Sequence, residues 1–347
     1  MCCKVSDNNT KLNFQLIMAD LSTTYMGLKL KSPIIAASSG LTGTVEDIKS
    51  FAHEGAGAVV IKSIFEEEIH KELEHDMDQM NRESFLYPET MDFYDNYMQD
   101  DALTRHLQLI REAKKAVDIP IIASVNCVTA DKWPYYAETL QDAGADAIEL
   151  NIFVLPSDPD HSAAENQELP YKVAKEVLKY VSIPVSLKIS YYSADLANHI
   201  KGLSETGIKG LVLFNRFYSP DIDVNNMEIV SSHVLSSPGE LPISLRWVAI
   251  TSDRVSCDIA ASTGVHDGIA AIKQLLAGAS AVQVASAFYR HGKEYMAQML
   301  KDMDKWMDQN GYTSINDFKG KLSYEKAKNP AAYERVQFMK HFSGYEG

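Results

Sequence analysis

Short apolar runs alternate with longer segments of helical spacing along most of the chain, from about residue 34 to residue 305. Compact β-rich runs predict strands, and apolar positions that recur every three or four residues predict helices. The predicted strands are Ile34–Ser38, Ala58–Lys62, Ile121–Val125, Ala147–Asn151, Val185–Ile189, Gly210–Phe214, Ser256–Ala261 and Ala281–Ala285. The alternation is typical of repeated βα units.

Segments with helical spacing follow these strands. We expect helices at Val45–His53, Thr104–Val117, Lys132–Ala143, Tyr171–Tyr180, Ala194–Thr206, Gly268–Ala277 and Glu294–Gln309. Three helix-to-strand turns share a form, AGADAIEL (143–150), TGIKGLVL (206–213) and AGASAVQV (277–284), in which glycine supplies a left-handed helix cap. Parallel strands of near-continuous hydrophobicity close most naturally into a (β/α)8 TIM barrel.

Two insertions interrupt the rhythm, after strand two (residues 63–100) and after strand six (residues 215–243). Both follow the carboxyl ends of strands, at the rim where barrel enzymes carry their active sites, so we expect them to cover a substrate. No second domain is indicated. We expect residues 1–20 to be a disordered leader and residues 21–347 to form one domain.

Composition narrows the class of partner. Forty-seven acidic and thirty-three basic side chains give a formal net charge of -14, which disfavours nucleic acid and anionic membrane surfaces. Much of the excess lies in an acidic insertion at residues 66–101. Its carboxylates lack the spacing of a calcium loop, so a solvated excursion is the favoured interpretation.

The four cysteines, Cys2, Cys3, Cys127 and Cys257, form neither a disulfide framework nor a zinc motif, and no metal site is predicted. No run of eighteen apolar residues occurs, and the first residues are polar where a signal peptide is apolar. We therefore expect a cytoplasmic protein.

The segment 259–288, IAASTGVHDGIAAIKQLLAGASAVQVASAF, carries the strongest chemical signal. A strand ends in Ser262-Thr263-Gly264, a helix is expected to start near Asp267, and the next strand ends in Ala285-Ser286. Small residues at these strand ends let backbone N–H groups approach a phosphate. The same residues would also suit a pair of tight turns.

Polar residues close several other strands. Lys62 and Lys188 each end a fully apolar run, and such a lysine in the barrel mouth suits an anionic partner such as phosphate, carboxylate or the N1 region of a reduced flavin. Asn151 and Asn215 offer amides to the edge of a planar heterocycle, or could cap a turn. The small residues Ser38, Ser39, Gly40 and Ser124 would let a flat cofactor lie close over the barrel.

With these residues placed, the chain resembles the dihydroorotate dehydrogenase family, nearest its soluble, fumarate-linked class, from about Leu21 to Leu322. The matching segments are AASSG (36–40), VVIKS (59–63), ELN (149–151), LKISYY (187–192), the region 259–288 and the tail GYTSINDFKGKL (311–322). The region 259–288 has Thr263 where the family usually has glycine. SSPG (236–239) stands in place of a glycine-rich flavin contact.

The resemblance implies a flavin mononucleotide (FMN) site. The flavin-binding residues that it implies are Ser38, Ser39, Lys62, Ser63, Ser124, Asn151 and Lys188, with Thr263, Gly264, Ala285 and Ser286 at the phosphate. Lys62, Asn151 and Asn215 are implied to bind the substrate ring. The resemblance also implies a homodimer and a small-molecule or protein electron acceptor.

The departures from the family lie on the substrate side. The run LNIFVLP (150–156) puts Val154 at the position of the catalytic base, and valine cannot accept a proton. Pro156 and Glu83 replace two asparagines that bind orotate in the family, and a carboxylate at position 83 would repel an anionic substrate unless Arg216 compensates. The catalytic residue is therefore unassigned. The candidates for a replacement proton donor, none of which is assigned that role, are Ser157, Asp158, Asp160, His161, Tyr191, Tyr192 and Cys127.

Three functional hypotheses follow. The first is an FMN-dependent oxidoreductase that transfers hydride between a dihydropyrimidine-type ring, dihydroorotate or a relative, and flavin N5. The second is an enzyme similar to dihydropyrimidine dehydrogenases for another heterocycle, whose iron–sulfur partner would be a separate chain because no CxxCxxC cluster occurs here. The third is a flavin-binding protein that has lost catalysis and serves as a partner.

Overall fold

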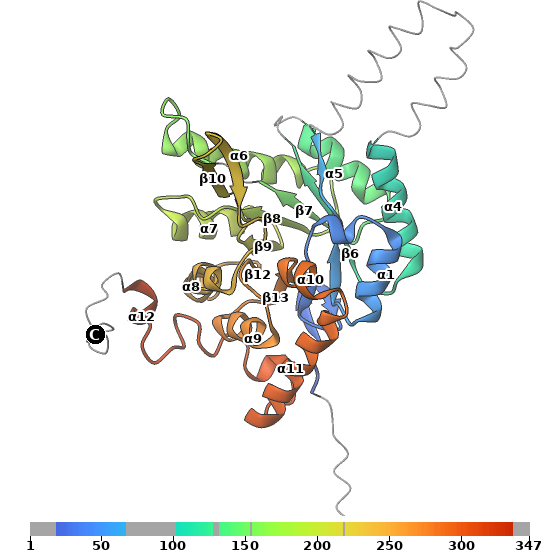
Figure 1. Ribbon diagram of the computed structural model, residues 1–347, viewed down its shortest axis with the longest axis vertical. Helices are drawn as coiled ribbons and strands as arrows, with labels where there is room; N and C mark the ends of the chain where they lie inside the picture. The colour runs from blue at the N-terminus through green and yellow to red at the C-terminus, as the bar shows by residue number, and fades with distance from the viewer. Residues whose placement is uncertain (1–18, 67–101, 128–131, 153–154, 218, 336–347) are drawn as a thin grey trace, which may run out of the picture.

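The computed structural model describes residues 19–66, 102–127, 132–152, 155–217 and 219–335. Its centre is a closed ring of parallel strands in which β4 also pairs with β6 (Figure 1). In chain order the ring contains β3 (Ile34–Ala36), β4 (Ala58–Val60) with its continuation β5 (Ile64–Phe65), β6 (Ile121–Asn126), β7 (Ala147–Asn151), β8 (Val185–Ile189), β9 (Gly210–Leu213), β12 (Asp258–Ser262) and β13 (Ala281–Val284). The predicted (β/α)8 TIM barrel is confirmed.

Helices surround this ring. They are α1 (Val45–His53), α4 (Ala102–Ala116), α5 (Trp133–Asp142), α6 (Ala163–Val177), α7 (Leu196–Ser204), α8 (Leu241–Thr251), α9 (Gly268–Ala277), α10 (Ser286–His291), α11 (Tyr295–Asn310) and α12 (Ala331–Glu334). The 3-10 helices η1 (Gly40–Thr42), η5 (Pro238–Glu240) and η6 (Ile315–Asp317) complete the connections. No helix in the described ranges has both the length and the apolar character that crossing a bilayer requires.

The short helices α10 and α12 were not predicted, and two longer helices also depart from the predictions. We expected a helix from Tyr171 onwards, but α6 starts at Ala163 and continues through Pro170. The signal for its true start is a capping box, in which Ser162 Oγ accepts from Glu165 N and the Glu165 carboxylate accepts from Ser162 N. Helix α8 was not predicted, because its sequence is apolar on most sides and lacks a clear stripe.

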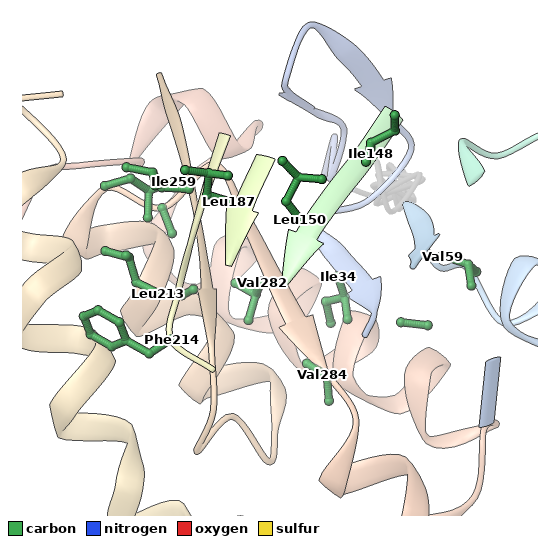
Figure 2. Close-up of a cluster of buried hydrophobic side chains, with 14 of the residues drawn as sticks. Ile34, Val59, Ile148, Leu150, Leu187, Leu213, Phe214, Ile259, Val282 and Val284 are labelled. Atoms are coloured by element: carbon green, nitrogen blue, oxygen red, sulfur yellow. The ribbon is translucent and has the colours of Figure 1, made fainter. Parts of the chain in front are cut away.

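Alternation along the strands separates two packed layers. Residues on the outer side, such as Ile148, Leu187 and Val282, pack against the helices, and Figure 2 shows this layer. Residues on the inner side form a second apolar cluster with the hairpin of β1 (Thr23–Tyr25) and β2 (Leu28–Leu30). This hairpin closes the barrel at the amino ends of the strands, and its members Tyr25, Met26 and Leu30 are buried.

The predicted glycine turns are confirmed. Gly144, Gly207 and Gly278 have φ of +100°, +105° and +116°, so each ends its helix in the left-handed region. The insertion after strand six contains a second hairpin, β10 (Ser219–Asp223) paired with β11 (Glu228–Ser232), which the sequence did not predict. The acidic insertion at 66–101 lies outside the described residues apart from Glu66, and the predicted leader does so apart from Ala19 and Asp20.

Candidate active site

The inner face of the barrel changes character from one end to the other. Toward the amino ends it is lined by small or apolar side chains, among them Ile35, Ala58 and Ala147. Toward the carboxyl ends the same alternation brings buried polar side chains inward. They are Ser124, Glu149, Lys188, Ser262 and Gln283. Buried polar groups cost stability unless they are paired, so this end is where function is expected.

A chain of hydroxyl groups joins three predicted flavin residues from strands one to three. Ser38 Oγ lies 3.0 Å from Ser63 Oγ, which lies 2.6 Å from Ser124 Oγ, and Ser63 N donates to Ser38 Oγ at 2.9 Å. Ser63 and Ser124 are buried. The structure therefore brings these three predicted residues together and fixes their hydroxyls.

A pocket with a volume of about 520 Å³ opens at the carboxyl ends of β8, β9, β12 and β13. Its lining includes seven of the predicted residues: Ser38, Lys188, Asn215, Thr263, Gly264, Ala285 and Ser286. Ser63, Ser124 and Asn151 do not line it but are bonded to residues that do, directly or through Ser63. Ser39 instead caps η1, where its Oγ accepts from Leu41 N. Lys62 is exposed at the end of β4.

The two predicted asparagines contact each other. Asn215 Nδ2 donates to Asn151 Oδ1 at 2.9 Å, and Asn215 Oδ1 accepts from Arg216 N at 3.0 Å. Each carboxamide is thus held by a neighbour in a fixed orientation. The Nδ2 group of Asn151 takes no part in this bond, so its two donors suit the edge of a planar ring.

One end of the pocket is lined by the loop after β12, at Thr263 and Gly264, and by the start of α10, at Ser286. Thr263 and Gly264 have φ of +74° and +79°, and a Cβ at Gly264 would lie 2.2 Å from Leu241 N. Ser286 begins the short helix α10 directly after the last barrel strand, and its Oγ accepts from Ser236 N at 3.0 Å. Leu235 and Ser236, the latter being the first residue of the SSPG segment, line the pocket beside it.

His266 and Asp267 lie next to this end of the pocket. Asp267 caps α9 by accepting from Ala270 N at 2.7 Å, as the sequence predicts. His266 Nε2 lies 3.1 Å from Ser236 Oγ. Burial, and then the charge of Arg290, lower the pKa of His266, so its ring is neutral at pH 7 and adds no positive charge here.

Arg216 is already occupied within the protein. Its Nε donates to Glu240 Oε2 at 2.8 Å, and its terminal nitrogens donate to the carbonyls of Val234 and His233 at 3.0 and 2.6 Å. Burial would raise the pKa of Glu240, but the Arg216 guanidinium and Ser237 lower it overall. Arg216 therefore fastens the β10–β11 insertion to η5, and its charge is balanced before any substrate binds.

The candidate replacement proton donors are scattered. Ser157, Asp158, Asp160 and His161 are all exposed, with His161 Nδ1 3.5 Å from Asp158 Oδ2. Cys127 is buried at the end of β6. Pro156 is exposed, while Val154 and Glu83 lie outside the described residues.

Tyr191 and Tyr192 stack at 4.6 Å beside the pocket, and Tyr191 also meets the ring of Phe214 edge-on at 5.8 Å. A hydrogen bond with Tyr192, with burial second, raises the pKa of Tyr191 to about 12. A phenol in that range holds its proton at neutral pH and can donate it but cannot act as a base.

Sequence reasoning missed Glu149 and Gln283. Lys188 Nζ donates to Gln283 Oε1 at 3.2 Å and lies 3.7 Å from Glu149 Oε1, and Gln283 Nε2 donates to Glu149 Oε2. Two sequence signals were available. Glu149 is two positions before Asn151, so strand alternation puts both side chains on the inner face, and Gln283 is the one polar residue in the apolar run AVQV.

Comparison with known proteins assigns the family. The family model described as dihydroorotate dehydrogenase matches residues 20–307. A relative from Thermoplasma acidophilum, named dihydroorotate dehydrogenase B (NAD(+)), catalytic subunit, is 28% identical over 320 residues, which cover 87% of this chain and 99% of the relative. A protein of the same name from Pyrococcus abyssi is 26% identical over 312 residues, 86% of this chain and 98% of its own.

A third relative, from Aeropyrum pernix, is provisionally named dihydroorotate dehydrogenase A (fumarate). It is 28% identical over 311 residues, 87% of this chain and 97% of its own. The relatives thus include names of both the NAD-linked and the fumarate-linked class. Because the family model spans well over half of the sequence, the chain belongs to the dihydroorotate dehydrogenase family.

Proposed function

We propose that this protein is an FMN-dependent oxidoreductase that transfers hydride between a dihydropyrimidine-type ring, dihydroorotate/orotate or a relative, and flavin N5. The observation that carries the proposal is the pocket at the carboxyl ends of the barrel strands, which gathers seven of the predicted residues. Its volume of about 520 Å³ lies within the range of cofactor sites, roughly 300–1,000 Å³.

The residues at one end of the pocket fit a phosphate. Barrel enzymes commonly bind phosphate with the loops after strands seven and eight and the start of a short extra helix. Here those parts are Thr263 and Gly264 after β12 and Ser286 at the start of α10. Gly264 itself lines the pocket, and its missing Cβ lets the loop after β12 pack against the Glu240–Leu241 backbone, which fixes the position of this loop.

The residues at the other end fit a flat ring that gains negative charge when it is reduced. When bound, FMN supplies the atom that accepts or donates the hydride. The Lys188 ammonium lines the pocket floor and stabilises negative charge that develops next to it, while Ser38 presents a small hydroxyl surface. Asn151 and Asn215, held against each other at 2.9 Å, orient the substrate ring.

A second candidate is a flavin-binding protein that has lost this catalysis. One observation favours it: the described lining of the pocket contains no Asp, Glu, His or Cys side chain that could take a proton from the ring. An enzyme similar to dihydropyrimidine dehydrogenases would need such a base as well. Reduction of the bound flavin by a dihydropyrimidine separates the enzyme hypotheses from the flavin-binding one.

The electron acceptor belongs to the same proposal. Two of the relatives are named as catalytic subunits of NAD(+)-linked enzymes. We extend this to a protein electron carrier or a small-molecule acceptor that reoxidises the flavin. A homodimer is the proposed assembly, as the family resemblance implies.

The experiment is anaerobic bleaching of the flavin band by dihydroorotate, dihydrouracil or dihydrothymine, added separately to the purified, FMN-loaded protein. The enzyme hypotheses predict bleaching by at least one of them. Asn215→Ala, which removes an amide that holds the ring, is expected to slow bleaching and leave the flavin bound. A protein that binds FMN and is bleached by none of the three, but is bleached by dithionite, would support the flavin-binding candidate.

A further inference from the structure

The Lys188 ammonium at the pocket is held by two other buried polar side chains, Glu149 and Gln283. It belongs to a buried triad in which Glu149 is 1% exposed, Gln283 1% and Lys188 8%. Glu149 sits on β7, Lys188 on β8 and Gln283 on β13, so the triad spans the interior of the barrel. Lys188 and Gln283 line the pocket, while Glu149 lies behind them.

The hydrogen bonds give the triad a direction. Gln283 offers its carbonyl oxygen to Lys188 Nζ at 3.2 Å and donates its Nε2 group to Glu149 Oε2. The reverse amide orientation would set an NH2 group against the ammonium and an oxygen against the carboxylate. The orientation of the Gln283 amide is therefore fixed by the Lys188 ammonium on one side and the Glu149 carboxylate on the other.

The charges balance within the triad. Glu149 Oε1 lies 3.7 Å from Lys188 Nζ and is itself buried without a hydrogen-bond partner among the described residues. An ionised carboxylate this deep is stable only beside a cation, and a buried ammonium only beside an anion. An ammonium has three N–H donors, so donors of Lys188 remain for a ligand in the pocket.

On this basis we propose that Glu149 is a positioning residue for the cofactor. Its carboxylate, acting through Gln283, holds the Lys188 ammonium at the pocket floor and offsets its charge, and thereby lowers the reduction potential of the bound flavin below what Lys188 alone would give. The inference rests on the proposed FMN site. It concerns a residue that touches neither the cofactor nor the substrate.

The test is the reduction potential of bound FMN, measured by anaerobic equilibration with a reference dye. Glu149→Gln keeps the shape and removes one negative charge, so the potential rises. We expect at least a tenfold change in the ratio of reduced to oxidised flavin at a fixed dye ratio, which is about 30 mV for a two-electron couple. Asp146→Asn, a charge removed just before the amino end of the same strand, is the matched control and leaves the potential unchanged.

Two further variants keep the proposal testable if Glu149→Gln folds poorly. Lys188→Met removes the cation, so the buried Glu149 carboxylate must either take up a proton or stay charged without a partner, and both cost stability. The double variant Glu149→Gln/Lys188→Met, which loses one charge of each sign, is therefore expected to have a larger free energy of unfolding than Lys188→Met, measured by chemical denaturation at pH 8. A double variant no more stable than Lys188→Met would show that Glu149 carries no charge beside Lys188 and overturns the inference.

The failures are distinguishable. If the unaltered protein quenches no FMN fluorescence, both the proposed function and this inference fall. If it binds FMN but no dihydropyrimidine bleaches it, the substrate proposal falls while the potential can still be measured with the dye. An unchanged or lowered potential in FMN-loaded Glu149→Gln contradicts the role of Glu149 alone.

Discussion

The two ends of the barrel interior are built from the same strands and obey the same alternation, yet they hold opposite chemistry. At the amino ends, Tyr25, Met26 and Leu30 of the β1–β2 hairpin fill the interior against small apolar residues. At the carboxyl ends, the interior carries a serine chain and the Glu149–Gln283–Lys188 triad beside an open pocket. Within the barrel interior, apolar packing is thus confined to one end, which leaves the other free to hold polar groups.

The largest effect is expected at the closed end. Tyr25 is fully buried, so Tyr25→Ala leaves a cavity and lowers the free energy of unfolding by about 3–5 kcal/mol. Chemical denaturation measures it. Tyr25→Phe is the control: the buried Tyr25 hydroxyl makes at most a weak contact with Ser186, so its removal changes the free energy of unfolding by about 1 kcal/mol or less. Equal losses in both variants would mean that the hydroxyl, not the ring, matters.

At the open end, His106 on α4 makes stability depend on pH. Burial, and then the charge of Lys62, lower the pKa of His106 from 6.5 to about 4. The folded state therefore binds this proton less readily than the unfolded state, and stability is lost as pH falls from about 6.5 toward 4, by at most about 3 kcal/mol.

Denaturation midpoints measured from pH 7.5 to pH 4 test the His106 prediction. His106→Leu is expected to reduce the loss of stability between pH 6.5 and pH 4. His199 and His266 also have lowered pKa values, chiefly because of burial, so a residual slope of the same sign remains in that variant. An unchanged loss of stability in His106→Leu would show that other groups cause it.

Two glycines with similar backbone angles, one at each end of the barrel, allow the two ends to be compared by the same substitution. Gly27 in the β1–β2 turn has φ of +78°, and an added Cβ there would meet no atom within 4 Å, whereas at Gly264, φ +79°, an added Cβ would lie 2.2 Å from Leu241 N. Gly27→Ala costs about 1 kcal/mol from its backbone angle alone, and Gly264→Ala about 2 kcal/mol or more. Only Gly264→Ala is expected to weaken FMN binding. Equal FMN affinity in the two variants would remove Gly264 from the phosphate site.

The smallest effect concerns single hydroxyls. Ser124→Ala removes one hydrogen bond of the serine chain and lowers the free energy of unfolding by about 1 kcal/mol. We expect it also to reduce FMN affinity, because Ser63 and Ser38 lose a fixed partner. Ser186→Ala, which removes a donor to Ile148 O at 3.3 Å, is the control and leaves FMN affinity unchanged. Titration of flavin fluorescence against both variants compares them.

Strand positions were predictable because each strand is an apolar run with β-branched residues between recognisable turns. Residues of the pocket were predictable where a polar side chain stands at the end of a strand, as for Lys188 and Asn215. It was not predictable where the contact depends on distant partners. Glu149 and Gln283 are 134 positions apart, and the bonds that occupy Arg216 come from an insertion whose hairpin has no strong strand signal.

The β1–β2 hairpin, which closes the amino end of the barrel, has a consequence for synthesis of the chain. Thr23 Oγ1 donates to Ser280 O and Met26 N to Asp258 Oδ2, so the first hairpin of the barrel docks on its last two strands. At typical synthesis rates of roughly 5–20 residues per second, the hairpin waits on the order of tens of seconds before those strands emerge. In a nascent chain stalled before residue 258, Tyr25, Met26 and Leu30 therefore lack the last two strands that help to bury them in the folded barrel.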